Sequence, residues 1–348
     1  MFKNNRLRNS IKLAIAGIMA SAIAGNIKTT NNQALAQSQL KVVASHNVIC
    51  DLLDTIAQET IELTCLLDGD RDPHAYRPTP GDRKKIEQAG IVFYGGYQLE
   101  PQISELLTEI EVPKIALYEQ VVTEPIMAEH KHGGHEDHEG HEGHEDHEDH
   151  EGHEDHNEAG KKASNSELEP DPHVWHNVEN TVKMVDVINS LFLQANPDAA
   201  EQYLVNSNAL TEKFCELDAW IKDQIATIPA GKRVLVTTHD ALNYYVQAYN
   251  LEGYETLQGL SAESAPTASQ VRKLSEQIKA AGIPTIFAES TANDRVIRNV
   301  AKAADVELSE QSLYVDGLGA AANYTEMMSH NTCAIVNGLG GECEPFEP

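Results

Sequence analysis

Positive charge is scarce in this sequence of 348 residues. Lysine and arginine together number 26, against 54 aspartates and glutamates, so the formal net charge is −28. A nucleic-acid backbone is held by clustered Lys and Arg, and the body of the chain has no such cluster. We therefore expect no nucleic-acid partner, while 41% hydrophobic residues is ordinary for a folded globular protein.

Cysteine is also sparse. The chain has five cysteines and no C-x-x-C motif, so neither a zinc ribbon nor a disulfide-rich scaffold is predicted: Cys50, Cys65, Cys215, Cys333 and Cys343. In an oxidising compartment Cys50 could pair with Cys65, or Cys333 with Cys343, which would leave an odd thiol. The connectivity stays open at this point.

No apolar run of the chain is long enough for a typical membrane span. The apolar stretch at residues 13–25 is short against the roughly 20 residues that a spanning helix needs. It follows four basic residues within positions 3–12 and precedes the A-x-A sequence at 34–36, the layout of a secretory signal. We predict a signal peptide over residues 1–36, with a membrane anchor as the alternative. The leader has no cysteine for a lipid anchor, so we expect a soluble periplasmic protein.

Two familiar catalytic signatures are missing. The H-E-x-x-H motif of zinc proteases does not occur, because the repeated histidines are spaced as H-x-x-H. The GLGAAA sequence at 317–322 is similar to a dinucleotide fingerprint but lacks the strand context that the fingerprint requires. The motifs therefore give no support for either class of enzyme.

Histidine, by contrast, is abundant, and ten of the 16 histidines lie within residues 130–156. Nine of them recur at every third residue: His132, His135, His138, His141, His144, His147, His150, His153 and His156. This tract has no apolar face to bury, so we predict a disordered, acidic, histidine-rich loop over residues 129–160. Its acids favour protonated imidazole, and chelation would order a flexible chain, so we expect several weak, auxiliary zinc sites there.

Outside the tract, β-rich runs alternate with amphipathic stretches from Leu40 onward, which indicates parallel sheets covered by helices. Strands are predicted at 40–45, 61–67, 91–96, 114–119, 233–239 and 284–290. Helices are predicted at 47–58, 81–89, 99–110, 241–249, 266–281, 293–304 and 323–337. We therefore predict an α/β fold with an N-terminal lobe (37–196), a linker helix (197–226) and a C-terminal lobe (227–348). A ligand site is expected in the cleft between the lobes.

Six histidines lie outside the tract, and three of them occupy positions suited to a metal ligand. His74 and His173 each end a D-P-H tripeptide in a predicted loop. His239 ends a predicted strand, at the edge where parallel sheets carry ligand sites. In so imidazole-rich a chain, these three together predict a metal site. Of the other three, His46 is predicted to be a hydrogen-bonded polar residue. His176 lies three residues after His173, and one metal rarely needs both. His330 is predicted to lie at the surface of the last helix.

Four motifs carry a resemblance that covers nearly all of the mature chain: DPHAYRPTP, DPHVW, VTTHDALNYYVQAY and IFAES. In this order they resemble the high-affinity zinc and manganese solute-binding proteins of ABC importers, most closely the zinc-binding members. The resemblance implies two Rossmann-like lobes joined by a long rigid helix, with one metal ion in the interlobe cleft. Position by position, it implies that His74 and His173 of the first lobe and His239 of the second bind that ion. It also implies a monomeric periplasmic receptor that delivers Zn2+ to a membrane permease and is not an enzyme.

The chain departs from the manganese-binding pattern at two positions. Manganese members have a carboxylate where His239 stands, and an Asp shortly before the Tyr and Met-Met pair of the last helix, where this chain has Ala322. Three imidazoles suit zinc, because manganese favours oxygen donors. The fourth ligand is left open between water and a nearby carboxylate. Two other functions also stay open: a zinc buffer or storage protein that uses the tract, and a zinc hydrolase with a general base beside an open metal position.

Overall fold

The first lobe is built on a four-stranded sheet in a computed structural model that describes residues 39–129, 168–262 and 266–347. Its strands, in the order β2-β1-β3-β4, are β1 (Leu40–Ala44), β2 (Ile61–Cys65), β3 (Ile91–Tyr94) and β4 (Lys114–Ala116). All three pairings are parallel, as the β-α alternation predicts. The strand predicted over 114–119 ends early, because Leu117–Val121 forms helix α4, with Leu117 and Tyr118 buried.

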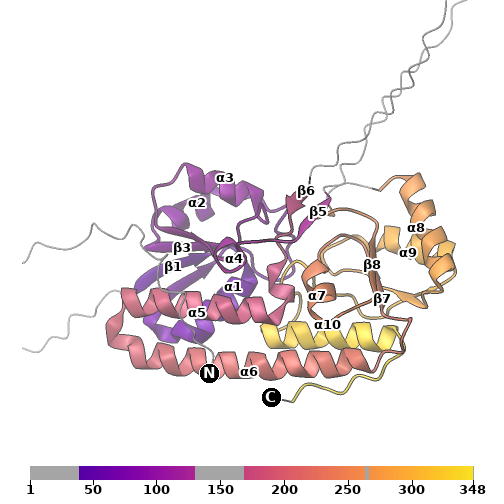
Figure 1. Ribbon diagram of the computed structural model, residues 1–348. Helices are drawn as coiled ribbons and strands as arrows, with labels where there is room; N and C mark the ends of the chain where they lie inside the picture. Colours follow the sequence, from indigo (N-terminus) through magenta and orange to yellow (C-terminus); the bar gives the residue numbers. More distant parts are fainter. Residues whose placement is uncertain (1–38, 130–167, 263–265, 348) are drawn as a thin grey trace, which may run out of the picture. The chain divides into compact units, whose positions relative to one another are not determined.

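Helices cover both faces of this sheet (Figure 1). Successive strand residues point to opposite faces, so Val42 belongs to one hydrophobic core and Val43 to another. Helix α1 (Asn47–Ala57) packs in the core of Val42, whereas α2 (Pro80–Glu87) and α3 (Pro101–Thr108) pack in the core of Val43. The helices cover the faces of the sheet and not its edge, so polar residues can lie in the loops that follow the carboxyl ends of β1 and β2.

The second lobe has shorter strands. They form two parallel pairs: β7 (Val234–Thr237) with β8 (Gly253–Thr256), and β9 (Thr285–Ile286) with β10 (Glu307–Leu308). Phe287 N–H donates to Val236 O at 2.9 Å, which joins the end of β9 to β7. The helices of this lobe are α7 (Asn243–Ala248), α8 (Ala268–Ala281) and α9 (Asp294–Ala304). Strand β9 is much shorter than the predicted strand at 284–290, and the sequence does not predict β8 or β10.

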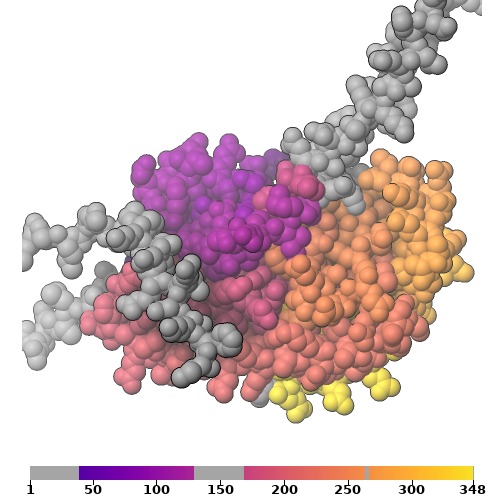
Figure 2. Space-filling view, in the orientation of Figure 1, coloured from indigo at the N-terminus to yellow at the C-terminus, as the bar shows by residue number. Residues whose placement is uncertain are grey.

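Long helices support both lobes. They are α5 (Val178–Ala195), α6 (Ala200–Ala226) and α10 (Tyr324–Gly338). Helix α6 contacts α1, α5 and α10, and runs beneath both lobes in Figure 1. The rings of Phe214 and Tyr324 lie 5.0 Å apart, and the same core reaches Leu235 of β7. The predicted long helix is confirmed, although it begins at Ala200, after a 3-10 turn at Pro197–Ala199. Figure 2 shows the surface of α6 continuing below the first and second lobes.

Both of the possible cysteine pairs are disulfides. Cys50 of α1 is bonded to Cys65 at the end of β2, and Cys333 of α10 is bonded to Cys343. Their Cα atoms lie 6.0 and 5.2 Å apart, within the usual range for a disulfide. Cys215 on α6 is free and exposed. Two structural disulfides are typical of a protein from an oxidising compartment.

Two predicted segments fall outside the described residues. These are the signal peptide over residues 1–36 and nearly all of the loop over 129–160. Strands β5 (Met127–Glu129) and β6 (Leu168–Pro170), which flank the tract in sequence, form an antiparallel pair in which Glu129 is opposite Leu168. Among the residues that the structure describes, no helix is long and apolar enough to cross a membrane.

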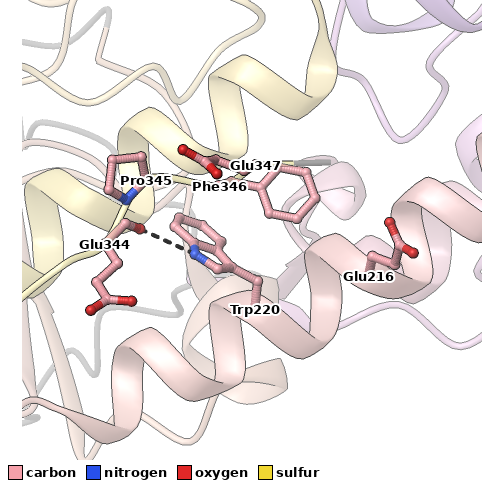
Figure 3. A pocket seen from close by; sticks show the side chains of 6 residues that line it. All are labelled: Glu216, Trp220, Glu344, Pro345, Phe346 and Glu347. Atoms are coloured by element: carbon pink, nitrogen blue, oxygen red, sulfur yellow. Dashed lines mark hydrogen bonds between the residues drawn. The ribbon is translucent and has the colours of Figure 1, made fainter.

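The C-terminal segment lies along α6 and forms part of a surface pocket (Figure 3). Trp220 donates its Nε1–H to Glu344 O at 3.1 Å, and the rings of Trp220 and Phe346 lie 5.4 Å apart. The pocket has a volume of about 710 Å³ and is lined by Glu216, Trp220, Glu344, Pro345, Phe346 and Glu347. It contains no histidine, so it is not the predicted metal site.

Candidate metal centre

Four side chains that could hold a metal ion converge in the interior of the described chain: His74, His173, His239 and Asp316. One candidate ligand atom of each lies within 4.8 Å of those of the other three. The exposed fraction is 0% for His173 and His239 and 7% for His74, so the group is buried. The structure therefore brings together the three histidines singled out in the sequence, and adds an aspartate that the sequence does not reveal.

The separations between these atoms suit a small four-coordinate ion. Nε2 of His74 lies 3.2 Å from Nε2 of His173. Oδ1 of Asp316 lies 3.6, 3.5 and 3.2 Å from Nε2 of His74, His173 and His239, respectively. A tetrahedron with metal–ligand bonds of about 2.05 Å has edges of roughly 3.3 Å, so these four of the six separations are close to those of a tetrahedral zinc site, while the remaining two lie within 4.8 Å.

His74 lies in the loop between β2 and α2, in a turn made by its own tripeptide. Asp72 Oδ1 accepts a hydrogen bond from His74 N–H at 2.8 Å. The loop ends at a capping box, in which Thr79 and Asp82 each accept from the other's backbone N–H. Tyr76 also donates to Asp82 Oδ2, at 3.0 Å. These contacts fix the loop on both sides of the histidine.

His173 precedes α5 in a second turn of the same kind. Asp171 Oδ1 accepts from His173 N–H at 2.9 Å and from its Nδ1 at 2.8 Å, while Asn243 donates to Asp171 Oδ2 at 3.1 Å. A histidine that donates Nδ1–H to a carboxylate keeps the lone pair of Nε2 free for a metal. Burial alone would lower the pKa of His173, but hydrogen bonds to Asp171 and Asp316 outweigh it and raise the pKa.

His239 follows β7 and is oriented by Glu289, which follows β9. Glu289 Oε1 accepts from the N–H groups of Thr238 and His239, both at 2.9 Å, and Oε2 accepts from His239 Nδ1 at 2.6 Å. Burial would lower the pKa of His239, but the negative charges of Glu289 and Asp316 raise it well above 6.5. These charges favour binding of a proton to this imidazole, so protons compete with a metal ion at this position.

Asp316 lies between β10 and α10, in a segment buried at Leu313 and Val315. Its Oδ1 faces the histidines, and its Oδ2 accepts a hydrogen bond from the hydroxyl of Thr291. Burial would raise the pKa of Asp316, but the neighbouring histidines, His239 foremost, lower it well below its ordinary value. The site therefore stabilises a carboxylate anion among the three imidazoles.

The expectation that Ala322 marks a missing carboxylate is wrong. Ala322 is exposed, and its N–H donates to Glu326 Oε2 at 2.9 Å. The carboxylate instead comes from Asp316, six residues earlier in the chain, which supplies a fourth candidate ligand. The available signal was a single acid in the otherwise uncharged stretch SLYVDGLGAA.

The other histidines that the structure describes have different partners. His46 Nε2 donates to Asp316 O at 2.9 Å, and His176 Nε2 donates to Val315 O at 2.8 Å. His46 is thus a hydrogen-bonded polar residue, as predicted. Burial lowers the pKa of His46 to about 4 and that of His176 to about 3, so both are neutral. His330 is partly exposed, and its Nε2 donates to Ser312 O at 2.9 Å. The tract histidines lie outside the described residues.

Known proteins share this sequence pattern. The profile of the ZnuA family, described as "Zinc-uptake complex component A periplasmic", matches residues 42–338. The chain is 27% identical over 309 residues to the manganese-binding lipoprotein MntA of Halalkalibacterium halodurans, which covers 86% of this chain and 88% of that protein. It is 27% identical over 326 residues to the manganese ABC transporter substrate-binding lipoprotein PsaA of Streptococcus pneumoniae, with 92% and 94% covered.

Solved structures share the fold. The periplasmic zinc binding protein TroA from Treponema pallidum superposes with a TM-score of 0.71 at 25% identity, covering 87% of this chain and 99% of that one. Fe(III)-bound YtgA from Chlamydia trachomatis gives a TM-score of 0.70 at 22% identity, covering 88% and 100%, and so bears on the fold alone. The family match and the two-lobe α/β fold with its long helix agree over most of the chain. The chain therefore belongs to the ZnuA family of metal solute-binding proteins of ABC transporters.

Proposed function

We propose that this protein is a periplasmic receptor that binds one zinc ion and delivers it to the membrane permease of an ABC importer. Nε2 of each of three histidines and Oδ1 of one aspartate would hold the ion: His74, His173, His239 and Asp316. The convergence of these four buried groups carries the proposal. Carboxylates bound to Nδ1 of His173 and His239 keep Nε2 of both rings free for the cargo ion.

Zinc is proposed over manganese because of the donor set. Three nitrogens and one oxygen suit zinc, whereas manganese favours sites richer in oxygen. The names of known relatives point both ways, since MntA and PsaA are named for manganese and TroA for zinc. Family membership alone therefore does not choose the ion, and the chemistry of the donors is the stronger guide.

A transport role is favoured over zinc hydrolysis by the number of protein ligands. Catalytic zinc sites typically have three protein ligands and keep one position for water, but here four side chains face one another. Glu289, a carboxylate close to the site, already accepts three hydrogen bonds, which makes it a poor general base. We therefore propose that the protein is not an enzyme.

The histidine tract is proposed to be an auxiliary collector of zinc. Its regular spacing of three does not keep histidines on one face of a helix with 3.6 residues per turn, so the repeat specifies no single rigid site. The four converging residues lie outside the tract, and each is held by hydrogen bonds to other described residues. Storage of zinc by the tract is the competing function. It predicts that several zinc ions bind with similar affinity, whereas the receptor predicts one tightly bound zinc ion.

Metal competition on the chain from residue 37 onward tests this proposal. We expect one tight zinc equivalent in competition with a chelator, and loss of bound manganese on addition of equimolar zinc. His239→Ala should lose the tight equivalent, whereas His330→Ala, a matched loss of one imidazole outside the site, should keep it. Manganese retained against zinc would contradict the choice of ion. Equal affinities of His239→Ala and the parent would contradict the ligand assignment.

A further inference from the structure

The backbone that carries Asp316 is held by two histidines of the first lobe. His46, which precedes the first residue of α1, donates from Nε2 to Asp316 O at 2.9 Å. His176, in the turn before α5, donates from Nε2 to Val315 O at 2.8 Å. A carbonyl oxygen can only accept, so Nε2 carries the proton in both rings. Two consecutive carbonyls of a second-lobe segment are thus bound by first-lobe side chains.

Asn47 makes a third contact of this kind. Its Oδ1 accepts from Leu318 N–H at 3.1 Å, and its Nδ2 donates to Gly69 O, in the loop of His74, at 2.9 Å. Gly317 packs so tightly here that a Cβ would lie 2.6 Å from Asn47 Oδ1. The segment at 315–318 is therefore seated closely on the start of α1. We refer to the three first-lobe residues as the loop clamp: His46, Asn47 and His176.

The clamp is poorly explained by fold stability alone. Nδ1 of His176 is buried and has no hydrogen-bond partner among the described residues. An unpartnered buried polar atom is unfavourable, so an apolar ring would suit this position better if packing were its only role. Nδ1 of His46 contacts Tyr118 OH at 2.6 Å, which fixes the ring with Nε2 directed at Asp316 O. Both imidazoles are thus oriented toward the segment that carries the carboxylate.

Asp316 is consequently attached to both lobes. Its backbone is bound by the clamp, and its Oδ2 accepts from Thr291 of the second lobe. We propose that His46, Asn47 and His176 are positioning residues for the cargo site, which hold Asp316 at the correct distance from the three histidines and so set the metal affinity. This inference rests on the proposed function, because it requires Asp316 to bind the ion.

A double-mutant cycle separates this role from a merely structural one. His46→Phe and Asn47→Ala are each made in the parent and in Asp316→Ala, and zinc dissociation constants are measured by chelator competition. Because partners of metal ligands typically contribute ~10–100-fold in affinity, we expect each clamp variant to weaken binding by about tenfold in the parent. In Asp316→Ala, His46→Phe should have little effect, since the aspartate through which it acts is gone, and Asn47→Ala should keep only the smaller effect of its lost contact with Gly69 O.

His330→Phe is the matched control, because His330 also donates from Nε2 to a backbone carbonyl between β10 and α10, that of Ser312 at 2.9 Å, but is not part of the clamp. It should leave the affinity nearly unchanged. Equal weakening in both backgrounds, or none in the parent, would overturn the proposal, as would an Asp316→Ala variant that binds like the parent. If His46→Phe does not fold, the test of the proposal rests on Asn47→Ala, because Asn47 is partly exposed.

The cycle is repeated with manganese. A parent that prefers manganese would contradict the proposed function while leaving the clamp testable with that ion. A parent that binds neither ion would overturn both proposals. In cobalt-loaded protein, the visible absorption of tetrahedral Co2+ should weaken in the clamp variants, which reports coordination geometry directly. An unchanged cobalt spectrum together with unchanged affinity would overturn the positioning role.

Discussion

Replacing Glu289 by glutamine should weaken zinc binding by roughly 10- to 100-fold, the usual contribution of a carboxylate that orients a metal-binding histidine. Glu289 is buried and accepts three hydrogen bonds, two from backbone N–H groups and one from His239 Nδ1. Glutamine Oε1 can still accept from the backbone, but its amide group then faces Nδ1. Because that amide donates, His239 would move its proton to Nε2, which lies 3.2 Å from Asp316 Oδ1. A protonated Nε2 cannot bind the ion.

The assay for Glu289→Gln is zinc competition with a chelator near neutral pH, with the melting temperature of the metal-free protein as a check on folding. Glu307→Gln on β10 is the matched control, because it removes the same charge from an exposed position. It should bind zinc like the parent. An affinity of Glu289→Gln within about twofold of the parent would refute the role of this hydrogen bond. If both variants lost zinc affinity equally, the loss would be due to the change in net charge and not to the hydrogen bond with His239.

Three further predictions concern the same site. Zinc affinity should fall as pH falls, and should still rise with pH above 6.5, because the raised pKa of His239 extends proton competition upward. Chelator competition at several pH values measures this, and a plateau above 6.5 would contradict it. Asp316→Ala should weaken zinc binding more than about 100-fold, since it removes a ligand and not merely a ligand's partner, whereas Ala322→Asp at its exposed position should change little. If Ala322→Asp changed the zinc affinity more than Asp316→Ala did in the same assay, position 322 and not Asp316 would be the place of the fourth ligand. Deletion of residues 130–156 should abolish the weak zinc equivalents and leave one tight equivalent, because the four converging residues lie elsewhere; calorimetric loss of the tight equivalent would make the tract the primary site.

Much of the first lobe could be predicted because its signals are local. Residues 42–44 of β1 are buried at every position, and β3 is apolar throughout with a buried centre, so both strands contain short continuous apolar runs. In the second lobe, β9 and β10 have only two residues each, too few to show any periodicity. Their pairing depends on tertiary contacts, such as that of Phe287 N–H with Val236 O. The missed strands are thus those with the least local sequence information.

The two D-P-H tripeptides were informative for the same reason. In each, the aspartate accepts the backbone N–H of the histidine two residues later, at 2.8 Å for His74 and 2.9 Å for His173. The turn is therefore encoded within three residues, and its repetition marks two ligand candidates. Glu289, by contrast, orients His239 from 50 residues away, and nothing in the motif around His239 identifies it as the partner.

Asp316 shows why the fourth candidate ligand could not be found from spacing. The expectation of a carboxylate at position 322 requires a fixed number of residues between that carboxylate and Tyr324. That path is set by distant contacts, since Leu318 N–H donates to Asn47 Oδ1 and Tyr324 N–H donates to Asp51 Oδ2, at 3.1 and 2.8 Å. Both acceptors belong to α1, more than 270 residues earlier in the chain. Because these contacts come from the first lobe, the position of this candidate ligand depends on the packing of the two lobes, and only the folded chain reveals it.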